Sequence, residues 1–549
     1  MDEAITLRQA GNVLFASRKY MQAYEKYSAA IELDQSNAIL FTNRAACGLE
    51  MKRCNLFAMT NRRFIIFSRV LDAMSDAQKA VKLDPKYAKG WSRLAQCQQE
   101  TGNWTVAVRS WKKALECVPT MNLTPAEQTL RRQFKEGLRS AENRIAAAKF
   151  DARGRQEPIS REDIKSGGLP WERAKAMMSH RPSESGMSSA WVIFEANKQF
   201  SEGMGQMSAL KKDQFGKAYH TPGTVEKILD GILRDKRVID MMTLGWTDRF
   251  NVQVLVENHA LCAWINNGPE EVIDLAQKRI LEKGWQSAGP AIALTIRYWV
   301  MNGFLTYAIA RDSAASVKWF TGALEVLERG QRVWKDISDE VRGMVFTDNF
   351  IRAVRSLHLE VYLDACESEL GKFNKTYTSE RVLELADDIY LDSCKTLSQE
   401  TNNPSTILSF RHYPAGMALA TKGWYHKQKA AEADCTPELC AVHNMKCAKL
   451  YLQAAKEWIP QDDELHCWYL RAALYAMLRA RAPLSSTLPV MAEIRKAYPE
   501  MKRIWEFSTA LKGRDETLTE ILDFEKKVLM ALQKGGLNME SRVLLGDKF

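Results

Sequence analysis

The stretch KGWSRLAQCQQETGNWTVAVRSWKKALECVP, residues 89–119, decides the fold of this chain. Its apolar and small residues recur three and four positions apart in two runs, which predicts two amphipathic helices. A proline closes the second run, since proline has no N–H to donate and fixes its own φ. The positions that carry the pattern are Trp91, Leu94, Ala95, Gly102, Ala107, Trp111, Ala114 and Pro119. The stretch therefore predicts an antiparallel pair of helices.

The same pattern recurs toward the N-terminus with a stride of about 34 residues. The first copy, LRQAGNVLFASRKYMQAYEKYSAAIELD, occupies residues 7–34, and its Gly11 and Ala23 fall where two antiparallel helices cross most closely. Three such copies predict three stacked helix pairs. The segment after Pro119, residues 124–150, begins with an N-capping threonine and has a polar outer face, so it predicts the terminal helix that caps such an array.

The second copy is interrupted by CNLFAMTNRRFIIFSR, residues 54–69. Removing this segment restores the stride, so it is an insertion at the turn between the two helices. Its FIIF run is apolar and strand-like, which is unusual for an exposed turn. One hypothesis is that the segment is translated non-coding sequence, from a retained intron or a wrong gene model. The other is a genuine loop that contacts a membrane or a partner.

The rest of the chain divides into two parts. Residues 151–223 are rich in Gly, Ser, Pro and charge, and we expect a linker whose short helices are ordered by packing Trp171, Trp191 and Phe194. Residues 224–549 have helical apolar spacing almost throughout and contain degenerate copies of the repeat, which predicts a larger, irregular α-solenoid. The chain is therefore predicted to be all-α, with the repeat domain over residues 1–150.

Composition narrows the classes of function. The formal net charge is +10, which favours an acidic partner. Basic residues are not interleaved with aromatic ones, so we expect no nucleic acid partner.

The N-terminus lacks a secretion signal, and the eleven cysteines have no framework spacing, which favours the reducing cytoplasm. The most apolar stretch, residues 288–310, contains Arg297 and Asn302, so an inner helix pair is preferred over a membrane span.

Residues 4 to about 150 resemble the carboxylate-clamp tetratricopeptide domains of co-chaperones such as the Hsp-organising protein. In that family the first helices of three repeats line a groove whose polar residues hold the carboxylates of an acidic C-terminal tail. The resemblance carries the clamp over to positions on the first helix of each repeat. These positions are Arg8, Asn12, Asn43, Lys89 and Arg93. Arg8 departs from the family pattern, in which this position is normally lysine.

Helix geometry gives the clamp positions a physical basis. Arg8 with Asn12, and Lys89 with Arg93, are i,i+4 pairs that share a helix face. Asn43 and Arg93 hold the same position in consecutive repeats, so stacking places them on one wall. Cations and amides gathered there suit a flexible peptide with several carboxylates.

These observations predict an adaptor or co-chaperone that binds the acidic tail of a heat-shock chaperone, while the C-terminal region binds a client. The alternatives are a repeat scaffold with another peptide ligand, or an enzyme with an unrecognised site in the C-terminal half. No phosphate loop or nucleophile motif is found, so we expect neither catalysis nor a cofactor.

One other constellation carries metal-ligand residue types. Four such residues occur within ADCTPELCAVHNMKCAKL, which starts at Ala433. They are Cys435, Cys440, His443 and Cys447. Their spacing matches no zinc motif, so they are weak metal candidates, and buried thiols are the expected interpretation.

Overall fold

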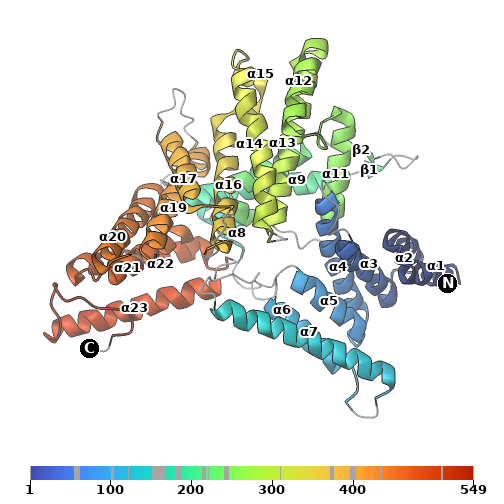
Figure 1. Ribbon diagram of the computed structural model, residues 1–549, viewed down its shortest axis with the longest axis horizontal. Helices are drawn as coiled ribbons and strands as arrows, with labels where there is room; N and C mark the ends of the chain where they lie inside the picture. Colours follow the sequence, from blue (N-terminus) through green and yellow to red (C-terminus); the bar gives the residue numbers. More distant parts are fainter. Residues whose placement is uncertain are drawn as a thin grey trace.

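The computed structural model describes residues 2–54, 62–100, 104–120, 123–150, 168–180, 187–209, 211–212, 218–219, 222–239, 246–308, 311–370, 376–395, 403–432, 435–508 and 511–547. Regular structure in these residues is helical except for two short strands, β1 (Lys211–Lys212) and β2 (Ala218–Tyr219), which pair antiparallel. The prediction of an all-α chain is confirmed. Figure 1 shows a helical arm, α1 to α7, beside a larger helical body, α8 to α23.

The arm consists of seven helices, and each packs on the next along the chain. Their bounds are α1 (Asp2–Ala16), α2 (Tyr20–Leu33), α3 (Ala38–Cys54), α4 (Arg62–Leu83), α5 (Ala88–Glu100), α6 (Trp104–Glu116) and α7 (Pro125–Phe150). The predicted helix pairs are α1 with α2, α3 with α4, and α5 with α6. Helix α7 packs on α6 as the predicted cap, and Thr124 and Glu127 form a capping box at its N-terminus.

Small residues let these helices approach closely. A Cβ atom added at Gly11 would lie 2.7 Å from the ring of Tyr27 on α2, so a larger residue there would force the two helices apart. At the other end of the arm, Gly137 of α7 stands against the indole of Trp111 in the same way. Ala23 is fully buried where α2 crosses α1. The repeat stride therefore marks the positions where only small side chains fit.

The inserted segment differs from its predicted conformation. Residues 55–61 lie outside the described residues, but α4 begins at Arg62, so the FIIF run is helical. The strand-like interpretation of this run was therefore wrong. The run continues without a turn residue into the second helix of the repeat, and extending a formed helix is easier than starting a strand without a partner. Helix α4 also contacts α11 and α13 of the body.

The body is an irregular array of helices. Many of them pack in succession along the chain, in the order α12, α13, α14, α16, α17, α19, α20, α21, α22 and α23. Its helices are α8 (Pro170–His180), α9 (Ser189–Ser208), α10 (Thr224–Arg234), α11 (Trp246–Leu261), α12 (Pro269–Lys283), α13 (Trp285–Ala308), α14 (Ser313–Val333), α15 (Asp339–Arg342), α16 (Asp348–Ser368), α17 (Ser379–Cys394), α18 (Pro404–Ile407), α19 (Tyr413–Lys429), α20 (Pro437–Gln453), α21 (Glu464–Arg479), α22 (Leu484–Trp505) and α23 (Leu511–Gln533). Short helical turns lie at η1 (Lys236–Val238), η2 (Met344–Phe346), η3 (Leu408–His412) and η4 (Ala454–Trp458).

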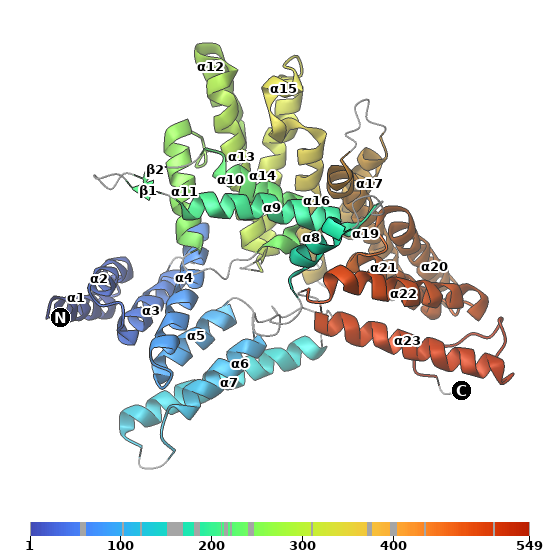
Figure 2. The same cartoon turned by 180° about the vertical axis from the view of Figure 1, so that it is seen from behind.

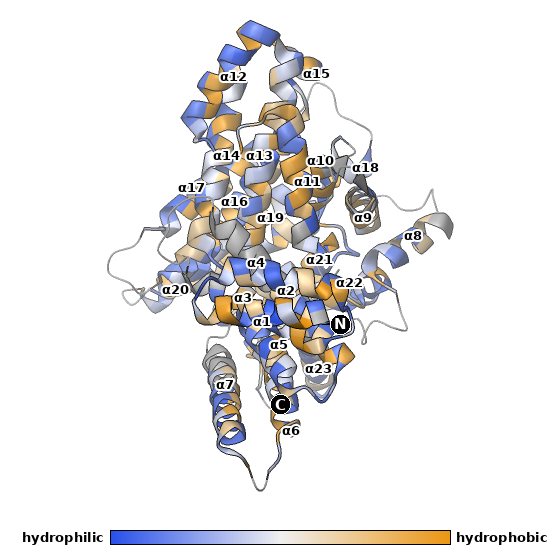
Figure 3. Ribbon diagram, turned by 90° about the vertical axis from the view of Figure 1, so that its right-hand side faces the viewer, coloured by the Kyte–Doolittle hydropathy of each residue, from blue (hydrophilic) through white to orange (hydrophobic). Residues whose placement is uncertain are grey.

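Most of these helices are amphipathic. Figure 3 shows hydrophilic and hydrophobic residues side by side along outer helices such as α12. Helix α13 is instead buried along most of its length. It contains the apolar stretch, and its Arg297 pairs with Glu226 of α10 at 2.6 Å. Among the helices of the described residues, none combines the length and apolar character that a membrane crossing requires.

The predicted linker contains two of these helices. Figure 2 shows α8 and α9 lying across the body from behind. Ile193 and Phe200 of α9 belong to the main hydrophobic core, and Trp171 and Phe194 pack against that core. The division of the chain at residues 150 and 223 stays a prediction.

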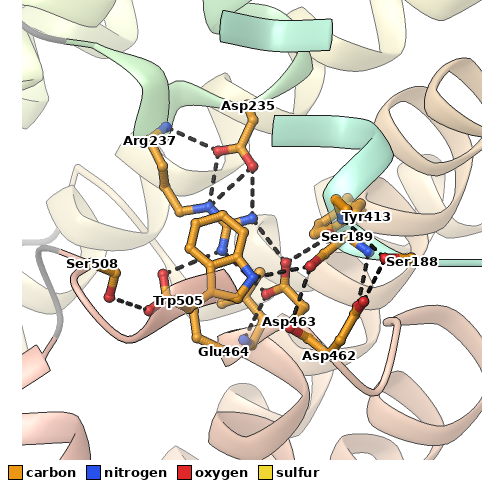
Figure 4. A network of polar contacts seen from close by, with 12 residues as sticks. Ser188, Ser189, Asp235, Arg237, Tyr413, Asp462, Asp463, Glu464, Trp505 and Ser508 are labelled. Atoms are coloured by element: carbon orange, nitrogen blue, oxygen red, sulfur yellow. Dashed lines mark hydrogen bonds and ion pairs between the residues drawn. The ribbon is translucent and has the colours of Figure 1, made fainter. Parts of the chain in front are cut away.

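A network of buried charges ties distant parts of the body together (Figure 4). The guanidinium of Arg237, in η1, lies 2.6 Å from Asp235, 2.9 Å from Asp463 and 3.2 Å from Glu464. It also stacks 3.6 Å from the centre of the Trp505 ring. The carboxylates raise the pKa of Arg237 although burial lowers it, so this cation is held charged inside the fold.

The same network fastens the start of α9 to the start of α21. The Ser189 backbone N–H donates to Asp462 at 2.8 Å, and the Ser188 hydroxyl donates to the same carboxylate. The indole N–H of Trp505 donates to the Ser189 hydroxyl at 3.0 Å (Figure 4). These partners are 273 and 316 positions apart in the sequence, so the contacts close the body rather than join neighbouring helices.

Candidate functional site

Two of the predicted clamp residues meet directly. Asn12 lies on α1 and Asn43 on α3, and the Asn43 side-chain amide donates to Asn12 Oδ1 at 3.2 Å. The same oxygen accepts a hydrogen bond of 2.8 Å from the Tyr27 hydroxyl. Because two donors point at Asn12 Oδ1, the Asn12 NH₂ group is directed away from them, toward its exposed side. Amides from the first and second repeats are therefore fixed next to each other.

The charges of two guanidinium groups, one from the first repeat and one from the third, act on one tyrosine. Tyr87 lies just before α5 and packs against the same hydrophobic cluster as Leu7 of α1. Burial raises the pKa of Tyr87, and the charges of Arg93 and Arg8 partly offset that rise. These two cations, which are 85 positions apart in the sequence (93 − 8), thus act on the same phenol.

Lys89 lies in the first turn of α5 and is exposed. One helical turn later Arg93 is half-buried, and its guanidinium donates to Gln96 at 2.8 Å. Among the described residues, neither Lys89 nor Arg8 forms an ion pair with an acidic side chain. The positive charge at these two positions is thus left for a ligand. We call the surface formed by Arg8, Asn12, Asn43, Lys89 and Arg93 the clamp face.

Arg44, next to Asn43, is a cation with a different role. Its guanidinium forms two hydrogen bonds of 2.7 Å with Asp76 of α4 and a third of 3.2 Å with Ser28 of α2. Together these three hydrogen bonds join α2, α3 and α4. Arg44 is therefore a bracing residue that holds α3 in place beside the clamp face.

The thiols below the clamp face are unreactive. Burial raises the pKa of Cys47 to about 12, and Arg93 only partly offsets this rise. Burial also raises the pKa of Cys97, and both side chains are fully buried. Because the thiolate is the reactive form of cysteine, the chemistry that this surface offers is non-covalent recognition of anions by cations and amides.

Sequence reasoning missed the residues that orient the clamp face. Tyr27, Tyr87 and Gln96 were not among the predicted site residues. The sequence could have predicted the role of Tyr27 from its repeat position opposite Gly11. A tyrosine ring that covers Gly11 brings its hydroxyl toward the adjacent Asn12 of α1.

The four metal candidates of the C-terminal half do not gather. Cys440 directs its thiol to the carbonyls of Ala430 and Cys435, and Cys447 is buried in the main core. Burial raises the pKa of Cys447 to about 11. No group of three or more His, Cys, Asp or Glu side chains in the described residues could hold a metal ion.

Comparison with known proteins finds similarity to part of this chain. It is 31% identical over 133 residues to the DnaJ homolog subfamily C member 7 homolog of Dictyostelium discoideum, which covers 24% of this chain and 21% of that protein. It is 34% identical over 110 residues to heat shock protein STI1 of Saccharomyces cerevisiae, which covers 20% of this chain and 16% of that protein.

A third relative is a repeat protein from the same yeast. The chain is 27% identical over 170 residues to small glutamine-rich tetratricopeptide repeat-containing protein 2, which covers 31% of this chain and 43% of that protein. No family model matches the chain. The matches thus span less than half of each relative. Within these limits, residues 4–150 of this chain resemble the tetratricopeptide domains of the carboxylate-clamp co-chaperones.

Proposed function

We propose that this protein is an adaptor whose clamp face binds the acidic C-terminal tail of a heat-shock chaperone. The observation that carries the proposal is the hydrogen bond between clamp residues of the first and second repeats, and the electrostatics at Tyr87 support a contribution from the third. Asn12 and Asn43 share a hydrogen bond, and Arg8 and Arg93 both act on Tyr87. A peptide end with a terminal carboxylate and acidic side chains has the charge and the acceptors that such a surface lacks.

The energy of such binding is modest. A hydrogen bond to a charged group is worth about 1.5–3 kcal/mol. A few of them, reduced by the cost of ordering a flexible tail, give binding near the micromolar range, or about 8 kcal/mol. Because Lys89 and Arg8 are not buried, salt should weaken the complex. The result is a reversible interaction, which suits an adaptor.

The co-chaperone relatives support the choice of partner. They match 24% and 20% of this chain, so their similarity supports tail binding by one part of it. We infer that the body binds a client or a second partner, that the protein works by binding rather than by catalysis, and that it acts in the cytosol.

A peptide array tests this function. The full chain and its Lys89→Ala/Arg93→Ala variant are applied to peptides that present acidic sequences either at a free C-terminus or internally. The proposal predicts that the chain retains the free-C-terminal acidic peptides and that the variant does not. Equal retention of internal peptides would instead favour a repeat scaffold with another peptide ligand.

A further inference from the structure

Two histidines of the body face each other across neighbouring helices. His426 lies in the last turns of α19 and His443 in the middle of α20, and these helices pack together. Their Nδ1 atoms are 3.0 Å apart, and their ring centres are 5.2 Å apart with a tilt of 38°. Both side chains are half-buried, so solvent still reaches them. His443 was a metal candidate in the sequence, but its structural partner is His426 instead of a cysteine.

We propose that His426 and His443 form a two-imidazole site for a zinc-class divalent cation, with solvent completing the coordination shell. This site lies in the body and is separate from the clamp face, so it does not depend on the proposed adaptor function. Imidazole suits zinc, copper and nickel ions. The site needs only these two protein ligands, which is consistent with the absence of any larger cluster in the described residues.

The separation of the two nitrogens fits metal coordination. With metal–nitrogen bonds of about 2.0–2.1 Å, two ligands lie about 2.9 Å apart in an octahedral shell and about 3.3 Å apart in a tetrahedral one. The observed 3.0 Å falls between these values, so a cation can be bound with shifts of a few tenths of an ångström at most. Without metal, one ring donates its Nδ1 proton to Nδ1 of the other ring in a hydrogen bond, and the tautomers decide which ring is the donor. When metal binds, that proton moves to Nε2 of its ring.

The charges around the pair permit a cation. The cations whose charges act on His426 are Lys446 and Lys422. Lys422 is itself compensated, because its ammonium lies 2.5 Å from Asp387. That leaves Lys446, an exposed side chain, as the main repulsive neighbour. Water screens the charge of one exposed lysine, so its repulsion of a bound cation is small.

The nearby thiols lie outside the site. Cys440, one turn before His443 on α20, donates to the Ala430 carbonyl at 3.2 Å. Cys447, one turn after His443, is buried. This arrangement predicts nitrogen ligands without sulfur, which distinguishes the site from a cysteine-based zinc site.

Zinc titration of the full, metal-stripped chain tests the proposal, with His426→Gln, His443→Gln and Cys440→Ser as variants. Each histidine variant removes a direct ligand and should weaken zinc binding at this site. Loss of an outer hydrogen-bond partner already lowers the affinity of a metal site roughly 10- to 100-fold, so we expect at least that loss here. Cys440→Ser is the matched control on the same helix and should bind zinc like the unchanged chain. Thermal unfolding without metal confirms that the variants are folded.

Cobalt(II) absorption of the unchanged chain provides a readout that needs no variant. The proposal predicts cobalt bands of nitrogen and oxygen ligation without thiolate charge transfer. Equal zinc affinity in the unchanged chain and both histidine variants would overturn it. A thiolate band, or loss of binding in Cys440→Ser, would overturn it in favour of a thiol site.

Discussion

The arm and the body are both built from packed helices, but they are held together in different ways. In the arm, each helix packs on the next, and fully buried alanines such as Ala23, Ala77 and Ala107 mark the crossings. In the body, buried charges join positions more than 200 residues apart, as in the contacts of Arg237 with Asp463 and Glu464. Local contacts that repeat can be read from a sequence stride, whereas long-range polar contacts leave no periodic trace.

The difference also separates binding from stability. The polar residues of the clamp face are exposed or half-buried, so they cost the fold little and remain available to a ligand. The polar residues around Arg237 are buried and paired, so they stabilise the body and are not available to a ligand. A charge change on the clamp face should therefore alter binding, and a charge change in the buried network around Arg237 should alter folding.

The largest expected effect is on the stability of the body. Arg237→Ala leaves Asp235, Asp463 and Glu464 buried without their cation, so we expect a loss of about 3–5 kcal/mol in unfolding free energy. Denaturant unfolding of the full chain measures it. The matched control is Arg503→Ala, whose partner Glu500 is exposed, and it should change stability by less than about 1 kcal/mol. Equal effects of the two variants would contradict the contrast between buried and exposed charges.

The next effect concerns binding by the arm. Lys89→Ala/Arg93→Ala removes two charge-assisted contacts, so affinity for an acidic C-terminal peptide should fall by about 3 kcal/mol. Calorimetric titration measures the loss. Lys112→Ala/Lys113→Ala removes the same charge from exposed positions on α6 and should leave affinity within a few-fold. A similar loss in both variants would show that binding follows net charge and not the clamp face.

The pH dependence of the body is a smaller effect. Burial lowers the pKa of His358 to about 4, and Arg381 lowers it further. An unfolded histidine binds its proton near pH 6.5, so the stability that neutral His358 contributes is present above pH 6.5 and is lost as the pH falls toward 4. Between pH 6.5 and 5 the loss is about 2 kcal/mol. His358→Gln should reduce this dependence in denaturant unfolding, and an unchanged pH profile would contradict the assignment.

The smallest effect sharpens the account of the clamp face. Tyr27→Phe keeps the ring against Gly11 but removes the hydrogen bond to Asn12, so peptide affinity should fall by about 1 kcal/mol while the arm stays folded. Tyr20→Phe, at the start of the same helix, is the matched control and should bind normally. If Tyr27→Phe also binds normally, the hydroxyl does not orient the amide for ligand binding.

The sequence predicted the arm well, because each repeat supplies its own contacts. The stride located the helix pairs, the cap and the crossing at Gly11. The repeat positions also placed Asn12 and Asn43 on neighbouring helices, where they form a hydrogen bond. The helical form of the FIIF run was missed because four apolar residues read alone resemble a strand, whereas their conformation is set by the helix that follows.

The body was predicted only as a class. Helical spacing indicated a solenoid, but the pairing of Arg237 with Asp463 depends on how the chain returns after more than 200 residues. The same limit applies to His443, because the sequence offered nearby cysteines as partners and the fold supplied His426 from the preceding helix. Tyr87 was missed because the effect of Arg8 and Arg93 on it arises only when the three repeats stack.

The central claim is that the clamp face recognises the free end of an acidic chain. The most direct test is calorimetric titration of the full protein with one acidic C-terminal peptide in two forms, as the free acid and as the C-terminal amide. Because the amide lacks one charge-assisted contact worth about 1.5–3 kcal/mol, we predict that it binds at least about tenfold more weakly. Equal affinity for the two forms would contradict the account.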